Sequence, residues 1–113
     1  MMDRFVILEH DHPFLHWDLM VEAGEVLRTW RLLQEPGLGK EVDAEPIGDH
    51  RKAYLAYEGP VSGGRGSVRR WDAGTIEWLV NGAERIVVLL HGERMKGRGV
   101  IEKGRFVIEA ERK

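Results

Sequence analysis

Short apolar stretches separated by turn-forming residues recur along this chain, and this pattern is typical of an all-β protein. Within a strand, side chains alternate between two faces with a period of two. The alternation is clearest in residues 15–22, where apolar and polar positions take turns. The sequence predicts strands at residues 5–9, 15–22, 26–33, 51–58, 67–71, 75–80, 85–91, 99–102 and 105–111.

Turn signals divide these stretches. Asp11-His12-Pro13 ends the first strand and separates it from the second, because proline lacks an amide hydrogen and constrains its own φ. Asn81-Gly82 is the strongest two-residue hairpin signal in the chain. Further turns are expected at residues 23–25, 59–66, 72–74, 92–97 and 103–104. Residues 34–49 are expected to form a long connection, and a loop of that length in a compact domain is more often functional than idle.

The expected fold is all-β and mainly antiparallel, with hardly any helix. About eight or nine short strands in so small a chain favour a closed or nearly closed β-barrel, which leaves few strand edges exposed. Residues 1–113 are expected to form a single domain, since either half alone would have no core.

Composition and charge narrow the possible functions. The formal net charge of −2 means that any phosphate binding must come from a local patch of basic residues. Cysteine is absent, which excludes disulfides, thiolate chemistry and cysteine-ligated metals. No apolar run approaches the roughly 20 residues of a membrane span, and the start of the chain lacks secretion-signal features. We expect a cytoplasmic protein without membrane contact.

A candidate metal site lies in the first hairpin. On a strand, His16 and Asp18 project from the same face, close enough for one cation to bridge them. His10 closes the preceding apolar run and can add a third ligand from a neighbouring strand. Two imidazoles and one carboxylate suit Mn, Fe or Zn. The same face continues through Met20 and Glu22, and the opposite face is apolar, with Leu15, Trp17, Leu19 and Val21.

Other interpretations of these residues stay open. An isolated H-x-D pattern is weak evidence, and the same residues are compatible with ordinary polar positions on the surface and in loops. A cupin-type pair of His10 and His12 is disfavoured, because His12 falls in the expected turn and the glycines and distant ligands of that pattern are missing.

His50 and Tyr54 form a second candidate cluster. Four residues apart, they would share one face of the predicted strand. His50 can contact a phosphate or donate a proton, although a loop histidine and a tyrosine at the edge of the core would look the same. Basic residues near them would form a phosphate-attracting patch or merely a solvated strand face: Arg51, Lys52, Arg65, Arg69 and Arg70.

The chain resembles the 3′-phosphoesterase domain of bacterial DNA ligase D and its stand-alone relatives. The resemblance runs through six pieces in the same order, and together they are specific although none is decisive alone. The pieces read FVILEH, HWDLMVE with GEVLRTW, DHRKAY, YEG, GRGSVRRWDAGT and LLHGERMKGRGVI.

That resemblance implies a compact β-barrel enzyme that uses manganese to trim 3′ ends of DNA or RNA during DNA repair. It would remove a terminal ribonucleoside and then the 3′-phosphate. By resemblance, His10, His16 and Asp18 match the metal ligands, which are the same three residues that strand alternation groups. His50 matches a histidine at the scissile phosphate, and Tyr54 matches a supporting tyrosine. Zn²⁺ or another transition metal is the alternative to Mn²⁺.

Two departures from the family pattern affect the expected activity. The family's arginine two residues after the aspartate is Met20 here, and a basic residue after the third strand is Gln34. Losing one charged donor that stabilises the transition state costs on the order of 10²–10³ in rate. Arg51, Lys52 or Arg65 would have to replace it.

The sequence therefore supports two hypotheses. One is a metal-dependent phosphoesterase acting on nucleic-acid 3′ ends. The other is a weakened or inactive barrel that binds metal and nucleic-acid ends, or a repair ligase or polymerase partner, without turnover.

Overall fold

The computed structural model describes residues 2–110, which form antiparallel strands and one short 3-10 helix, η1. The predicted all-β class is confirmed. Positions 1 and 111–113, which include the end of the predicted strand 105–111 and both ends of the predicted domain, lie outside the described residues. The elements are β1 (Asp3–His10), β2 (His16–Ala23), β3 (Val26–Leu32), β4 (Val42–Arg51), η1 (Lys52–Leu55), β5 (Gly59–Pro60), β6 (Ser67–Asn81), β7 (Arg85–Gly92), β8 (Lys96–Glu102) and β9 (Arg105–Glu109).

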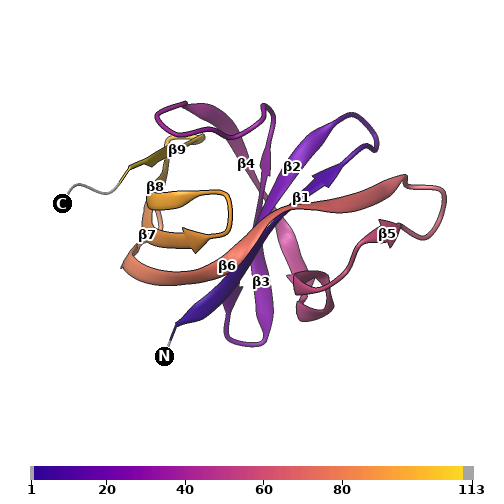
Figure 1. The fold of residues 1–113 in the computed structure, drawn as a ribbon, viewed down its shortest axis with the longest axis horizontal. Coiled ribbons are helices and arrows are strands. Elements are labelled where there is room, and N and C mark those ends of the chain that lie inside the picture. The colour runs from indigo at the N-terminus through magenta and orange to yellow at the C-terminus, as the bar shows by residue number, and fades with distance from the viewer. Residues whose placement is uncertain (1, 111–113) are drawn as a thin grey trace.

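The strands form one sheet that returns on itself. Its order is β1-β2-β3-β4-β9-β8-β7-β6-β5, and β1 also pairs with β6, so the sheet is ring-like (Figure 1). The short strand β5 pairs with the first two residues of β6 through Gly59 and Pro60. Closure pairs most of the strands on both edges, the main exception being β4, and so leaves little unpaired backbone available for aggregation. Among residues 2–110, no helix has the length and apolar character that crossing a membrane requires.

The main core fills the inside of the ring. Alternate residues of β1 and β2 point inward, as predicted for Trp17, Leu19 and Val21, and they meet buried side chains from β3, β4 and β6 to β9. Leu15 departs from the predicted apolar row, because it precedes the first residue of β2 and is exposed.

A second apolar layer lies on the outer face of β1, β2 and β3. Val6, Leu8, Met20 and Leu27 are buried there against Leu55 of η1 and the neighbouring Tyr54, Val61 and Val68. Figure 1 shows η1 and β5 on the side of the molecule away from β7, β8 and β9. Residues 52–66 therefore cover the outer face of the first three strands, and both faces of these strands are packed.

The predicted long connection and the strand expected after it are both corrected. Half of residues 34–49 belongs to β4, which pairs with β3 and, through Val42 and Asp43, with β9. From Pro46 onward β4 has a partner on one edge only, and an edge strand tolerates a proline. Residues 51–58 contain η1 instead of the predicted strand, because the chain leaves the sheet at Arg51.

The turn predicted at Asp72-Ala73-Gly74 is also corrected, because these residues lie within the continuous strand β6. A bulge at Trp71 opposes the junction of Ile7 and Leu8 and bends the strand. Gly74 is required by close packing: a Cβ there would lie 2.1 Å from the carbonyl oxygen of His91.

Asp72 is only 3% exposed and holds the turn between β7 and β8. Its carboxylate accepts backbone N–H bonds from Arg94 at 2.9 Å and Met95 at 2.8 Å, and another from Ala73 at 2.8 Å. The acidic residue that suggested an exposed turn is therefore a buried acceptor for a distant segment.

We expect Asp72→Ala to lower the free energy of unfolding by about 2–3 kcal/mol, because buried amide groups lose their acceptor. Glu93→Ala, an exposed change in the same turn, is the matched control and should change stability by less than about 0.5 kcal/mol. Urea denaturation monitored by tryptophan fluorescence measures both. Equal stability of the two variants would contradict a structural role for this carboxylate.

Candidate metal centre

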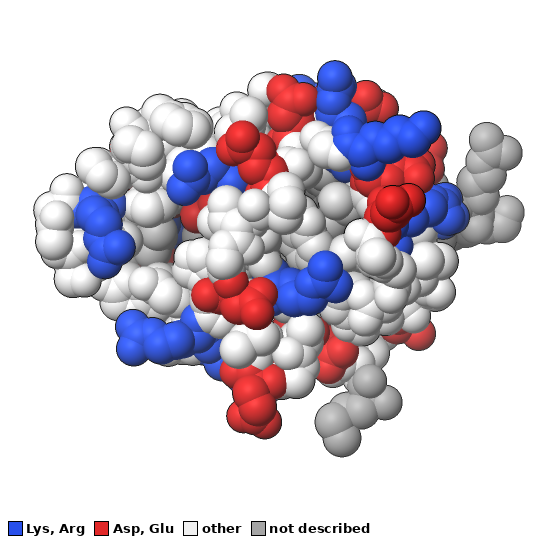
Figure 2. Space-filling view, turned by 180° about the vertical axis from the view of Figure 1, so that it is seen from behind, with Lys and Arg blue, Asp and Glu red and all other residues white. Residues whose placement is uncertain are grey.

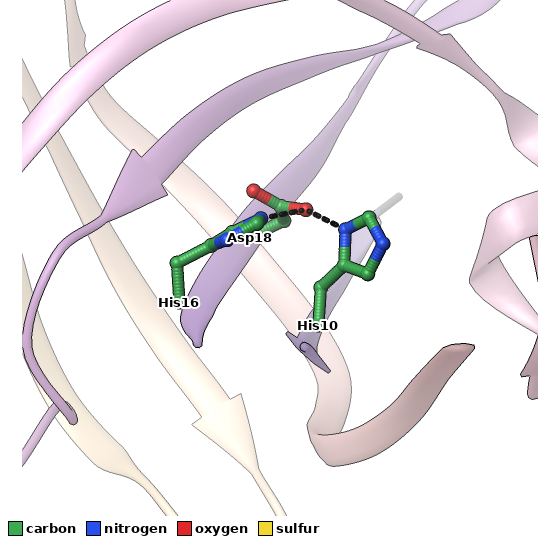
Figure 3. Close-up of side chains that lie close together, drawn as sticks. All are labelled: His10, His16 and Asp18. Atoms are coloured by element: carbon green, nitrogen blue, oxygen red, sulfur yellow. Dashed lines mark ion pairs between the residues drawn. The ribbon is translucent and has the colours of Figure 1, made fainter. Parts of the chain in front are cut away.

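Three predicted ligands converge where β1 ends and β2 begins. His10 is the last residue of β1 and pairs directly across from His16, the first residue of β2. Asp18 follows two residues later and projects from the same outer face. One ligand atom of each residue lies within 4.8 Å of the others. Figure 3 shows the two imidazoles on either side of the carboxylate.

Backbone carbonyls set the orientation of both imidazoles. Nδ1 of His16 lies 2.8 Å from the carbonyl oxygen of Phe14, and Nε2 of His10 lies 2.9 Å from that of Arg65. Because a carbonyl oxygen can only accept, these nitrogens must carry the hydrogens. The remaining nitrogens, Nε2 of His16 and Nδ1 of His10, face Oδ2 of Asp18 at 3.3 and 3.7 Å.

This arrangement leaves buried acceptor atoms facing one another. Nε2 of His16 and Oδ1 of Asp18 are buried and have no hydrogen-bond partner. A neutral imidazole nitrogen and a carboxylate both present lone pairs, so a positive charge between them is needed to relieve the repulsion. A histidine that binds a metal through one ring nitrogen usually donates a hydrogen bond from the other, often to a backbone carbonyl oxygen. The residues therefore fit a divalent cation held by His10, His16 and Asp18.

Two of the three residues, His10 and Asp18, line a groove of about 340 Å³, and His16 is fully buried beside them. Its wall also includes Met20 of β2, His50 and Tyr54, and Arg65 from the loop after β5. The groove lies on the outer face of the ring, beneath residues 52–66. The interior of the ring, by contrast, is filled by the main apolar core. His12 lines the groove and is exposed, outside the cluster of three.

His50 and Tyr54 come from two different elements and contact each other in the wall of the groove. His50 is the penultimate residue of β4 and Tyr54 belongs to η1, not to one strand as predicted. Their rings lie edge to face with centroids 5.6 Å apart. Nδ1 of His50 lies 2.9 Å from the carbonyl oxygen of Gly48, so it carries a hydrogen and leaves Nε2 available to a ligand.

The three predicted phosphate-binding residues are distributed over different surroundings. Arg65 lines the groove, although its guanidinium also donates to Ser62 at 2.7 Å. Lys52 forms an ion pair with Glu22 at 3.2 Å. Arg51 lines a neighbouring pocket beside Tyr57. Arg69 pairs with Glu9, and Gln34 is hydrogen-bonded to Asp43 instead of lining the groove.

Sequence reasoning missed Arg31, which also lines the groove. Arg31 lies on β3 directly across from Asp18, and opposed residues in an antiparallel pair project from the same face. The signal was present in the predicted hairpin of residues 15–33. Extending its pairing outward from Ala23 and Val26 brings Asp18 opposite Arg31.

Glu22 connects the groove wall to the sheet. Its Oε1 accepts the backbone N–H of Arg4 at 2.9 Å, and its other oxygen pairs with Lys52 of η1. The hydrogen bond from Arg4, and then the Lys52 ammonium, lower the pKa of the Glu22 carboxyl against the opposing effect of burial. Lys52 thus fastens the helix that carries Tyr54.

The surface charge is mixed. On the face shown in Figure 2, lysine and arginine alternate with aspartate and glutamate, and neither sign forms a continuous field. This agrees with the net charge of −2, and this face presents no field of one sign that would attract a phosphate.

Comparison with known proteins identifies similar sequences. A family model described as the DNA ligase D 3′-phosphoesterase domain matches residues 8–103. The multifunctional non-homologous end joining protein LigD of Mycolicibacterium smegmatis is 34% identical over 115 residues, which cover 85% of this chain and 15% of the relative. Its counterpart from Pseudomonas aeruginosa is 30% identical over 105 residues, covering 84% of this chain and 12% of the relative. The chain therefore spans a small part of the length of these relatives.

We expect Glu22→Gln to reduce stability by up to about 1 kcal/mol at neutral pH and to have little effect in acid. A carboxyl with a lowered pKa stabilises the fold above its unfolded pKa, and this contribution is lost as the pH falls through the folded pKa. Denaturation at a series of pH values measures the difference, with the exposed Glu25→Gln as control. A difference that does not change with pH would argue against this ion pair.

Proposed function

The chain belongs to the DNA ligase D 3′-phosphoesterase domain family, and from this membership and the geometry of the groove we propose that it is a metal-dependent phosphoesterase acting on nucleic-acid 3′ ends. The observation that carries the proposal is the pair of imidazoles that backbone carbonyls orient toward one buried carboxylate. The substrates would be a 3′-terminal ribonucleoside and a 3′-phosphate on DNA or RNA.

His10, His16 and Asp18 would hold the metal, with Mn²⁺ proposed first and Zn²⁺ or another transition metal as alternatives. When bound, such a cation supplies Lewis-acid polarisation of a phosphoryl oxygen and makes a water molecule more acidic. The carbonyls of Phe14 and Arg65 keep the ligating nitrogens of the two histidines free of hydrogen.

His50 and Tyr54, which also line the groove, would act on the substrate there. Hydrolysis of a 3′-phosphate forms a bond from a water oxygen to phosphorus and breaks the bond from phosphorus to the 3′ oxygen. Removal of the terminal ribonucleoside, which leaves the 3′-phosphate behind, breaks the bond from phosphorus to the 5′ oxygen of that ribonucleoside instead. In both steps the attacking water loses a proton and the leaving oxygen gains one. Protonated His50 would donate that proton from Nε2, because its Nδ1 is engaged with Gly48. Tyr54, edge to face with the His50 ring, would keep the imidazole in position.

A second candidate function is binding of metal and 3′ ends without turnover. It is favoured by Met20, which occupies the groove wall where the resemblance expects an arginine, and by Gln34, whose amide is used to hold Asp43. In this case the groove would bind the 3′ end of a nucleic-acid strand and present it to a partner protein.

The names of the relatives suggest the setting. They are described as multifunctional non-homologous end joining proteins. We propose that this chain likewise processes DNA ends in repair, together with ligase or polymerase activities carried on the same or another chain.

Manganese at 100 times its dissociation constant should raise the free energy of unfolding by about 2.7 kcal/mol, because the ion binds the folded state alone. In His16→Ala this increment should vanish, whereas His91→Ala, on the exposed part of β7, should retain it. Denaturation with and without metal measures the increment. If both variants respond to manganese as the wild type does, the ion binds elsewhere.

With manganese, the purified protein should release phosphate from a DNA primer bearing a 3′-phosphate. His16→Ala should abolish the release, and His50→Ala should reduce kcat by about 10²–10³ because a positioned proton donor is lost. His91→Ala is again the control. Absence of turnover over a broad set of metals and 3′ ends, with 3′-end binding intact, would replace the enzyme by the binding function.

A further inference from the structure

Arg31 is placed to act on a ligand in the groove. It lies on β3 directly across from Asp18, and both side chains project from the outer face of the sheet into the same groove. On that face, Met20 is the next residue of β2 after Asp18, and its side chain is buried and apolar. Arg31 of β3 thus brings a cationic side chain to a region where β2, the strand that carries Asp18, has none.

The guanidinium of Arg31 has unused hydrogen-bonding capacity. Its Nε is buried and has no hydrogen-bond partner, and among residues 2–110 no carboxylate forms an ion pair with it. Glu45 lies across from it on β4 but is exposed and makes no such pair. The guanidinium carbon lies 5.6 Å from the centre of the Phe14 ring, which holds the side chain without supplying an acceptor.

A buried N–H donor without an acceptor is costly, and the cost falls when an anion binds. Arginine presents a planar fork of donors that matches two oxygens of a phosphate group. The apolar surroundings from Met20 and Ile47 weaken competition from water and so strengthen this contact.

The other basic residues near the groove are already engaged. Arg65 donates to the carbonyl and the hydroxyl of Ser62, and Lys52 pairs with Glu22. Arg51 faces the neighbouring pocket. Of the described basic residues, Arg31 therefore combines a place in the groove with a buried, unsatisfied donor.

We propose that Arg31 is the principal phosphate-binding residue of this groove, gripping the non-bridging oxygens of a terminal 3′-phosphate beside the carboxylate and imidazoles of the metal centre. The proposal rests on the proposed function for the nature of the ligand. It assigns the phosphate contact to a residue of β3 instead of a residue of β2, the strand that carries His16 and Asp18.

The test uses binding without turnover. The probes are two oligonucleotides that differ at the 3′ end, one with a hydroxyl and one with a methylenephosphonate, whose carbon–phosphorus bond resists hydrolysis. With manganese present, the wild type should bind the phosphonate at least about tenfold more tightly. Arg31→Met should lower this preference by about ten- to a hundredfold, because a charge-assisted hydrogen-bonded contact is lost. Arg31→Lys should retain part of it, because the charge remains but the fork does not.

The matched control is Arg28→Met, which removes another arginine of β3. The Arg28 side chain donates a hydrogen bond to Asn81 and lies over the Trp30 ring. This variant should leave the phosphonate preference unchanged. The manganese affinity of each variant separates damage to the metal centre from loss of phosphate binding, and it should be unchanged in Arg31→Met. If Arg31→Met unfolds, Arg31→Lys and Arg31→Gln provide the comparison.

The outcomes separate this inference from the proposed function. Loss of the preference in Arg31→Met supports the inference even if the wild type never turns over a substrate. An unchanged preference in Arg31→Met overturns it, even if the wild type is an active phosphoesterase. A general weakening toward both oligonucleotides, or an equal loss in Arg28→Met, would show that Arg31 serves the fold and also overturns the inference.

Discussion

The candidate site depends on two imidazoles that share one carboxylate. The carbonyls of Phe14 and Arg65 each accept a hydrogen bond from one ring nitrogen, of His16 and His10 respectively. The other nitrogen of each ring therefore faces Asp18 with a lone pair. This orientation is costly without a positive charge between the three groups. It follows from the register of β1 and β2, which opposes His10 and His16 and leaves Asp18 two residues further along the same face.

The rest of the architecture encloses that cluster. The inner face of β1, β2 and β3 packs into the core of the ring, while the outer face is covered by residues 52–66. The covering segment also sets the chemistry, because Arg65 supplies the carbonyl that orients His10. The ion pair of Glu22 and Lys52 fastens η1, so the wall that carries Tyr54 and the sheet that carries the ligands are joined.

Part of the positive charge in the groove comes from β3, the strand next to the one that carries Asp18, and Arg65 adds to it from the covering segment. Met20 makes the outer face of β2 apolar beyond Asp18, while Arg31 enters from β3. Because opposed residues of antiparallel strands share a face, a cation can move to the neighbouring strand and still serve the same groove. The loss of a basic residue from one position of a motif therefore does not by itself show that the groove has lost its positive charge.

Local patterns in the sequence were enough to predict the first hairpin, the all-β class and the grouping of His10, His16 and Asp18. Strand alternation is a property of the backbone, so it can be read from neighbouring residues. Tertiary structure decided the rest: β4 forms through pairing with β3 and β9 despite Pro46, and Asp72 is buried because it accepts amides from a distant turn. The place of Arg31 opposite Asp18 follows from the register of the predicted hairpin of residues 15–33. The separation of Arg51 and Lys52 from the groove depends instead on where the covering segment returns. The contacts of β4, Asp72 and that segment join residues far apart in the chain, and local periodicity carries no information about them.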